Sequence, residues 1–282
     1  GKNLTSGAFN VLIGRNAGDA LTDGDANVAI GYLALSSENG HGRNIAIGQQ
    51  ALEDLNAGAD ANNIAIGYDS GKQLISGIQN VFVGNGSGDA LTTGRDNVAI
   101  GHNTMSAANG SEARNVAVGR SSLEVNTTGN DNTAQGIESL TVNTTGASNT
   151  ALGRNALSGN TTASNNTAVG RRAGYVITTG TSNTILGANS AFAMTTGSQN
   201  TALGQSCMFA ITTGSYNIAV GKGSLNTATT ADSNLAIGVD ALTANTTGTY
   251  NVSVGNYSLD ANTTGSSNIA MGDRALGANT TG

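Results

Sequence analysis

Asn149-Thr150-Ala151-Leu152-Gly153 is the stretch that decides the fold of this chain, because versions of it recur sixteen times. Each copy begins with Asn and has Gly four residues later. The Asn residues stand at 10, 27, 44, 63, 80, 97, 115, 132, 149, 166, 183, 200, 217, 234, 251 and 268. The spacing is 17 residues in thirteen of the fifteen intervals, 19 after Asn44 and 18 after Asn97. A fixed period this short is typical of a solenoid, in which each coil packs on its neighbours.

The residues after the Asn read as a strand that is buried on both faces. We number each coil from its Asn as position 1. Positions 2 to 4 are apolar or Thr in nearly every coil, as in Val28-Ala29-Ile30, and Gln135 is the polar exception. A strand with one wet face alternates apolar and polar residues, and this one does not. A 17-residue coil is too thin to cover both faces, so the pattern predicts that chains associate through this strand.

Three other columns of the repeat carry structural predictions. The Asn at position 1 is predicted to form a ladder of side-chain hydrogen bonds along the stack. The Gly at position 5 indicates either a left-handed turn or crowding of the backbone. Position 8 is always small, and we interpret Cys207, which stands there, as a buried core residue.

Positions 9 and 12 exchange bulk with each other. Gly174 goes with Ile177, whereas Leu140 goes with Asn143, and fourteen of the sixteen coils follow this rule. The exceptions are the pairs Leu52/Leu55 and Met208/Ile211. The exchange predicts that the two positions fill one core pocket of nearly constant volume.

The rest of each coil is rich in turn residues, often Thr-Thr-Gly before the next strand. We predict two short strands and two turns per coil, with the extra residues of the longer coils in surface turns near Asp60 and Glu112. Residues 1–282 are predicted to form a single all-β domain, a parallel β-solenoid (β-roll) of about sixteen 17-residue coils. The chain begins at Gly1 and stops at a repeat boundary, Gly282, so we expect a segment of a longer fibre protein.

Composition excludes several classes of function. The net charge of −6 disfavours a nucleic-acid partner, and no apolar run approaches the ~18 residues of a membrane span. No base, metal cluster or paired carboxylate stands out from the repeat, so we predict neither enzymatic activity nor a cofactor or metal site. Gly84-Asn85-Gly86-Ser87-Gly88 mimics a dinucleotide-binding loop, but these glycines are repeat positions. Acidic residues in turns, such as Asp23 and Asp96, are interpreted as solvated rather than as calcium ligands.

The repeat resembles the head repeats of trimeric autotransporter adhesins. Asn-Val-Ala-Ile-Gly at 27–31 and 97–101 is similar to the pentapeptide of that family. The 17-residue form with Asn-Thr-Thr-Gly, as in residues 234–248, is similar to repeats of phage tail fibres. The resemblance covers essentially the whole chain, although the adhesin repeat is usually shorter. It implies a left-handed parallel β-roll in which three chains pack through the apolar strand.

The resemblance also implies a function without chemistry, namely attachment to a host cell-surface receptor or glycan. The expected location is extracellular, on a cell surface or on a virion. A structural filament that polymerises end to end is the alternative, and an ice-binding β-solenoid is a more distant one, because Thr-x-Thr ranks are missing. The Asn-Thr-Thr triplets match the glycosylation acceptor pattern as a by-product of the repeat. Aromatic side chains anchor interfaces and stack on sugars, so the candidate receptor contacts are Tyr32, Tyr68, Tyr216, Tyr250 and Tyr257.

Overall fold

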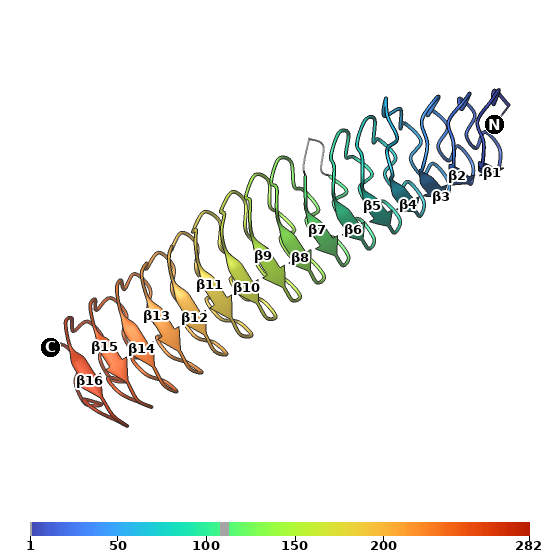
Figure 1. Ribbon diagram of the computed structural model, residues 1–282. Helices are drawn as coiled ribbons and strands as arrows, with labels where there is room; N and C mark the ends of the chain where they lie inside the picture. The colour runs from blue at the N-terminus through green and yellow to red at the C-terminus, as the bar shows by residue number, and fades with distance from the viewer. Residues whose placement is uncertain (1, 108–112) are drawn as a thin grey trace. The chain divides into compact units, whose positions relative to one another are not determined.

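The computed structural model describes residues 2–107 and 113–282, and within them the chain is an all-β parallel solenoid. It divides into two compact units, Gly1–Thr145 (unit 1) and Gly146–Gly282 (unit 2). Unit 1 holds β1 (Val11–Ile13), β2 (Val28–Ile30), β3 (Ile45–Ile47), β4 (Ile64–Ile66), β5 (Val81–Val83), β6 (Val98–Ile100), β7 (Val116–Val118) and β8 (Thr133–Gln135). Unit 2 holds β9 (Thr150–Leu152), β10 (Thr167–Val169), β11 (Thr184–Leu186), β12 (Thr201–Leu203), β13 (Ile218–Val220), β14 (Leu235–Ile237), β15 (Val252–Val254) and β16 (Ile269–Met271). Within each unit the strands stack in chain order (Figure 1).

Neighbouring strands pair in parallel so that equal repeat positions lie side by side. Val81 pairs with Val98, for example, and Phe82 pairs with Ala99. The 19-residue coil keeps this register, because its extra residues lie in an exposed turn around Asp60. The extra residue predicted near Glu112 lies outside the described residues.

The prediction of two strands per coil is wrong in the described part of the chain, where each coil has a single three-residue strand. The remaining positions form turns with left-handed backbone at positions 7, 9 and 17. In the coil of β7 these are Ser121, Leu123 and Asp131, with φ of 54°, 50° and 60°. Left-handed residues reverse the chain instead of extending it. Hydrogen bonds between coils hold the turns, such as that from the N–H of Leu123 to the carbonyl of Ser139 at 3.1 Å.

The side chain at coil position 3, the middle residue of each strand, points into the coil, and the side chain at coil position 8 packs against the strand. Ala99 and Ala134 are fully buried, as are Ser87 and Ser122 at position 8. The hydroxyl of Ser87 donates to the carbonyl of Ala99 at 2.7 Å, and that of Ser122 donates to Ala134 at 3.0 Å. Position 8 is therefore small because its side chain lies against the strand of the next coil.

The exchange of bulk between positions 9 and 12 is confirmed, and position 3 takes part in it. A Cβ atom added at Gly174 stands 3.0 Å from Cδ1 of Ile177 and 3.1 Å from Cδ1 of Ile185. Ile185 is position 3 of the following coil, where most coils have Ala. Phe82, also at position 3, fills the space beside Gly71 and Gly88 in the same way. Leu157, at position 9 of the coil before, is also 3.0 Å from the Cβ atom added at Gly174, so the pocket is shared by three positions and by three coils.

The Asn ladder is confirmed. The backbone N–H and Nδ2 of Asn183 both donate to Oδ1 of Asn166, at 2.9 and 3.1 Å, and Nδ2 also donates to the carbonyl of Gly197. Each side chain therefore joins two coils and closes its own coil. A second ladder, which was not predicted, runs through position 12, where Nδ2 of Asn143 donates to Oδ1 of Asn126 at 2.7 Å.

Both explanations for the Gly at position 5 are confirmed together. Gly153 has φ of +133°, and a Cβ atom there stands 2.6 Å from the carbonyl oxygen of Gly170 in the next coil. The left-handed conformation and the close approach of two backbones both exclude a side chain.

Candidate functional site

Coil positions 2 and 4, the first and last residues of each strand, form the outer strand face. Their side chains are half-exposed or exposed in all the described strands. The face carries Val, Ile, Leu and Met, with Thr at position 2 of β8 to β12 and Gln135 at position 4 of β8. None of these outward positions holds a charged residue. The chain alone therefore leaves the second face of each strand uncovered, and the predicted burial of that face depends on a partner.

The five candidate tyrosines are all exposed, with exposed fractions of 41% for Tyr32, 51% for Tyr68, 63% for Tyr216, 66% for Tyr250 and 39% for Tyr257. They fall in two groups. Tyr32 and Tyr68 follow β2 and β4 in unit 1, both at position 6. The other three lie in unit 2, with Tyr216 and Tyr250 at position 17 before β13 and β15, and Tyr257 at position 7. Tyr32 and Tyr68 therefore share one column of the stack, and Tyr216 and Tyr250 share another. One coil lies between the two members of each pair.

Two of these rings lie beside a guanidinium group. Cζ of Arg15 is 5.8 Å from the ring centroid of Tyr32, and Cζ of Arg274 is 5.6 Å from that of Tyr257. A cation over an aromatic ring stabilises its position by about 0.5–1 kcal/mol at an exposed site. The two tyrosines are therefore similar in exposure and in environment.

Sequence reasoning missed a stack of aromatic rings at position 10. Tyr175, Phe192 and Phe209 come from three consecutive coils of unit 2, and neighbouring ring centroids are 5.1 Å apart. The signal was present as three aromatic residues 17 apart. Because the rings are half-buried and cover one another, we interpret the stack as stabilising these coils.

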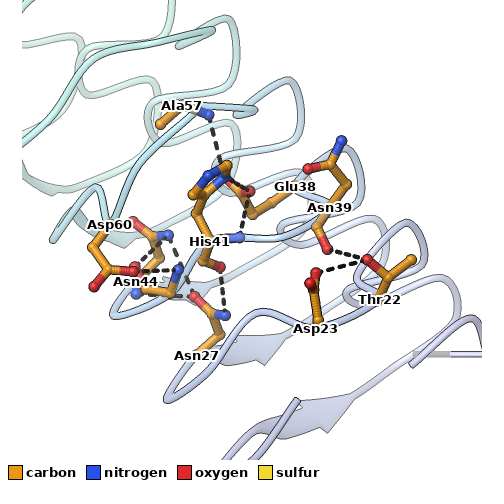
Figure 2. A network of polar contacts seen from close by, with 10 residues as sticks. Thr22, Asp23, Asn27, Glu38, Asn39, His41, Asn44, Ala57 and Asp60 are labelled. Atoms are coloured by element: carbon orange, nitrogen blue, oxygen red, sulfur yellow. Dashed lines mark hydrogen bonds and ion pairs between the residues drawn. The ribbon is translucent and has the colours of Figure 1, made fainter. Parts of the chain in front are cut away.

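A buried carboxylate marks the second coil. Glu38 stands at position 12, is fully buried, and accepts hydrogen bonds from the N–H groups of His41 and Ala57, at 3.1 and 3.3 Å. Its Oε1 also lies 3.2 Å from Nδ1 of His41, as Figure 2 shows. Through Ala57 the carboxylate holds the long turn of the 19-residue coil, which begins at Asn44. We interpret the pair of Glu38 and His41 as a structural substitute for the Asn that six other coils have at position 12.

The acidic turn residues bind backbone and neighbouring side chains. Oδ1 of Asp25 accepts from the N–H of Ala8 at 2.6 Å, and Oδ1 of Asp60 accepts from the N–H of Gly42 at 3.1 Å. Arg114 donates to both oxygens of Asp131, at 2.7 and 3.1 Å, and this hydrogen bonding lowers the pKa of the Asp131 carboxyl. Residues 2–107 and 113–282 contain no group of three or more His, Cys, Asp or Glu side chains placed to hold a metal ion.

Five of the six Asn-Thr-Thr triplets have a buried Asn, and the sixth, Asn279, is half-exposed. Asn126, Asn160 and Asn262 are fully buried, and Nδ2 of each donates to a backbone carbonyl within its own coil. The first Thr of the triplet extends the ladder, as where Oγ1 of Thr246 donates to the carbonyl of Thr263 at 3.0 Å. The five buried Asn side chains are therefore inaccessible to a glycosylating enzyme once the coil has formed.

Cys207 is buried, as predicted, and its Sγ lies 3.2 Å from the carbonyl oxygen of Ala219 and 3.2 Å from Oγ of Ser224. Burial raises the pKa of the thiol to about 11. A thiol that stays protonated at neutral pH is a poor nucleophile.

No family model, curated protein sequence or solved structure matches this chain. In the described residues no helix is long and apolar enough to cross a membrane. The same residues enclose no pocket.

Proposed function

We propose that this chain is a non-enzymatic fibrous segment, similar to those of bacterial adhesins and phage tail fibres, that assembles with two further copies of itself and attaches to a cell surface. The outer strand face is the observation that carries the proposal. Its side chains are apolar or Thr over fifteen of the sixteen strands, and uncharged in the other, where Gln135 stands. A sheet face of this kind is stabilised when it is covered.

A second copy of the chain matches this face better than an unrelated surface. The rungs repeat at ~4.8 Å, the spacing of stacked β-strands, so a copy placed in parallel presents side chains at the same interval. Side chains of both copies then interdigitate along many coils. Three copies arranged around one axis cover all three faces and leave none exposed.

Attachment is supported by what lies beside the strand. Position 6 is the residue directly after the Gly at position 5 that follows the strand. In unit 1 the column of residues at this position is exposed and includes Tyr32 and Tyr68. Aromatic residues on open surface are the usual anchors of a binding interface. The proposed site of action is outside the cell or on a virion.

The first test is the particle mass of this segment in dilute solution, measured by sedimentation equilibrium. We expect the mass of three chains. A monomer at micromolar concentration contradicts the proposed assembly, and open-ended polymers favour a structural filament instead. Attachment is tested separately, by binding of fluorescently labelled segment to cells, and no retention on any cell type tested contradicts that part.

A further inference from the structure

Position 6 of unit 1 forms an exposed column with a mixed composition. The coil of β8 has Ile137 at this position, and the seven coils before it have Arg15, Tyr32, Gln49, Tyr68, Asn85, His102 and Arg120. We name these seven residues the Tyr column. It contains two phenol rings, two amides, two guanidinium groups and one imidazole, and it contains no carboxylate. This composition is unlike the outer strand face, which lacks hydrogen-bonding groups over most of its length.

The backbone holds the Tyr column at a fixed spacing. The N–H of Gln50 donates to the carbonyl of Tyr32 at 2.8 Å, and the N–H of Asp69 donates to the carbonyl of Gln49 at 3.0 Å. The same bond recurs at 2.9 Å from Gly86 to Tyr68. Tyr32 and Tyr68 therefore stand two coils apart, roughly 9.5 Å at ~4.8 Å per stacked strand. This is the spacing of the backbone from which the two tyrosine rings project.

Amide groups lie between and beside the two rings. Gln49 is exposed in the intervening coil, and Asn85 follows Tyr68, where its Oδ1 accepts from the N–H of Tyr68 at 3.2 Å. An amide both donates and accepts hydrogen bonds, which suits a ligand rich in hydroxyl groups. A Tyr ring adds an apolar face and a polar hydroxyl.

We propose that the Tyr column binds an extended oligosaccharide, a β-1,4-linked chain of hexoses or N-acetylhexosamines. Tyr32 and Tyr68 stack on sugar rings two residues apart, because their separation is close to the length of one disaccharide in an extended chain. Gln49 hydrogen-bonds the sugar between them. The proposal rests on the attachment function above and names its ligand class.

The pair Tyr32 and Tyr68 is favoured over Tyr216 and Tyr250, which have the same two-coil separation. The residue between the latter is Ser233, whose short side chain does not reach past two large rings. Binding on open surface is weak for one chain, and three parallel chains raise the apparent affinity through simultaneous contacts.

The test is isothermal titration of the assembled wild-type segment with cellotetraose and with chitotetraose, and with maltotetraose as an α-linked comparator that does not extend. We expect binding of at least one β-linked probe and none of maltotetraose. Tyr32→Ala or Tyr68→Ala is expected to weaken binding about tenfold each. Tyr257→Ala is the matched control, since that ring has similar exposure and a similar Arg neighbour but no second Tyr in its column; it should bind as wild type.

Three outcomes overturn the proposal. They are absence of binding by both β-linked probes, equal loss with the Tyr257→Ala control, and a change of particle mass in the Tyr32→Ala variant, which assigns the column to contacts between chains. Circular dichroism of each variant verifies folding. If cells still bind a segment that binds neither probe, the sugar assignment fails and attachment stands; if probes bind but cells do not, attachment fails.

Discussion

Asn97 is bonded twice to the side chain of Asn80. Its backbone N–H and its Nδ2 both donate to Oδ1 of Asn80, each at 3.1 Å, and both side chains are fully buried. Asn80 in turn donates through Nδ2 to the carbonyl of Gly94 at 2.8 Å. One amide thus satisfies backbone groups of two coils, which explains why no other residue type appears at position 1.

Replacing Asn80 by Ala should lower the free energy of unfolding by about 2–5 kcal/mol, because buried donors and acceptors lose their partner. Urea denaturation followed by circular dichroism measures the change. Asn39→Ala, the same substitution at an exposed side chain, should cost less than about 0.5 kcal/mol. Equal effects of the two variants contradict the ladder as a source of stability.

Gly153→Ala should destabilise more than a left-handed backbone alone explains. The new Cβ atom stands 2.6 Å from the carbonyl oxygen of Gly170, so the two coils have to separate. Gly58→Ala is the control, since Gly58 has φ of +70° and nothing within 4 Å of an added Cβ. For Gly58→Ala we expect a loss of stability of about 1 kcal/mol, because Ala is strained in left-handed backbone. For Gly153→Ala we expect a clearly larger loss, measured by thermal unfolding. Similar losses refute crowding at position 5.

Gly174→Leu should overpack the shared pocket and cost about 1–3 kcal/mol or more, because the side chain meets Ile177, Ile185 and Leu157. Adding Ile177→Asn should relieve only part of the loss. Adding Ile185→Ala as well reproduces the composition around Leu157 in the coil before and should restore most of it. Denaturation of the single, double and triple variants measures this order, and full rescue by Ile177→Asn alone shows that Ile185 does not share the pocket.

Ile100→Asp should abolish assembly while leaving the fold of the chain intact. The side chain points outward from β6 and is 39% exposed, so the charge is hydrated in a single chain but buried when a second copy covers the face. Sedimentation gives the mass, and circular dichroism verifies folding. Ile75→Asp, at an exposed turn position, is the control and should keep the wild-type mass. A normal mass for Ile100→Asp argues against the outer strand face as the interface.

Cys207 should make stability fall at high pH. The folded-state pKa of about 11 lies above the ordinary value of 9.0, so deprotonation favours the unfolded chain. The stabilisation linked to the protonated Cys207 thiol amounts to about 2–3 kcal/mol. It is complete below pH 9 and is lost as pH rises through 11. Cys207→Ser keeps a small donor at position 8, as in Ser87, and should lack this fall. Urea denaturation from pH 8 to 11 compares the two, and parallel curves contradict the prediction.

The stacking ladders were predictable because they depend on the period alone. A residue that recurs every 17 positions meets its own copies in a parallel in-register stack, whatever the shape of the coil, so the Asn and Gly columns followed from their spacing. The shape of the coil was harder to predict. Ser121 and Leu123 have no strong preference for left-handed backbone, and hydrogen bonds to the neighbouring coils impose it. This is why the expected second strand is absent from the coils as far as the structure describes them.

For the core and the candidate site, too, some features followed from the sequence and others only from the structure. The sequence by itself determined that the chain is a parallel β-solenoid with an uncharged strand and a small buried position 8, since these depend only on which residue types recur at 17-residue intervals. Only the tertiary structure decided that Ile185 and Phe82 enter pockets left by glycines of neighbouring coils. It alone also decided that Tyr32, Gln49 and Tyr68, which share position 6, are exposed. Both results depend on the turn geometry, which packing between coils imposes.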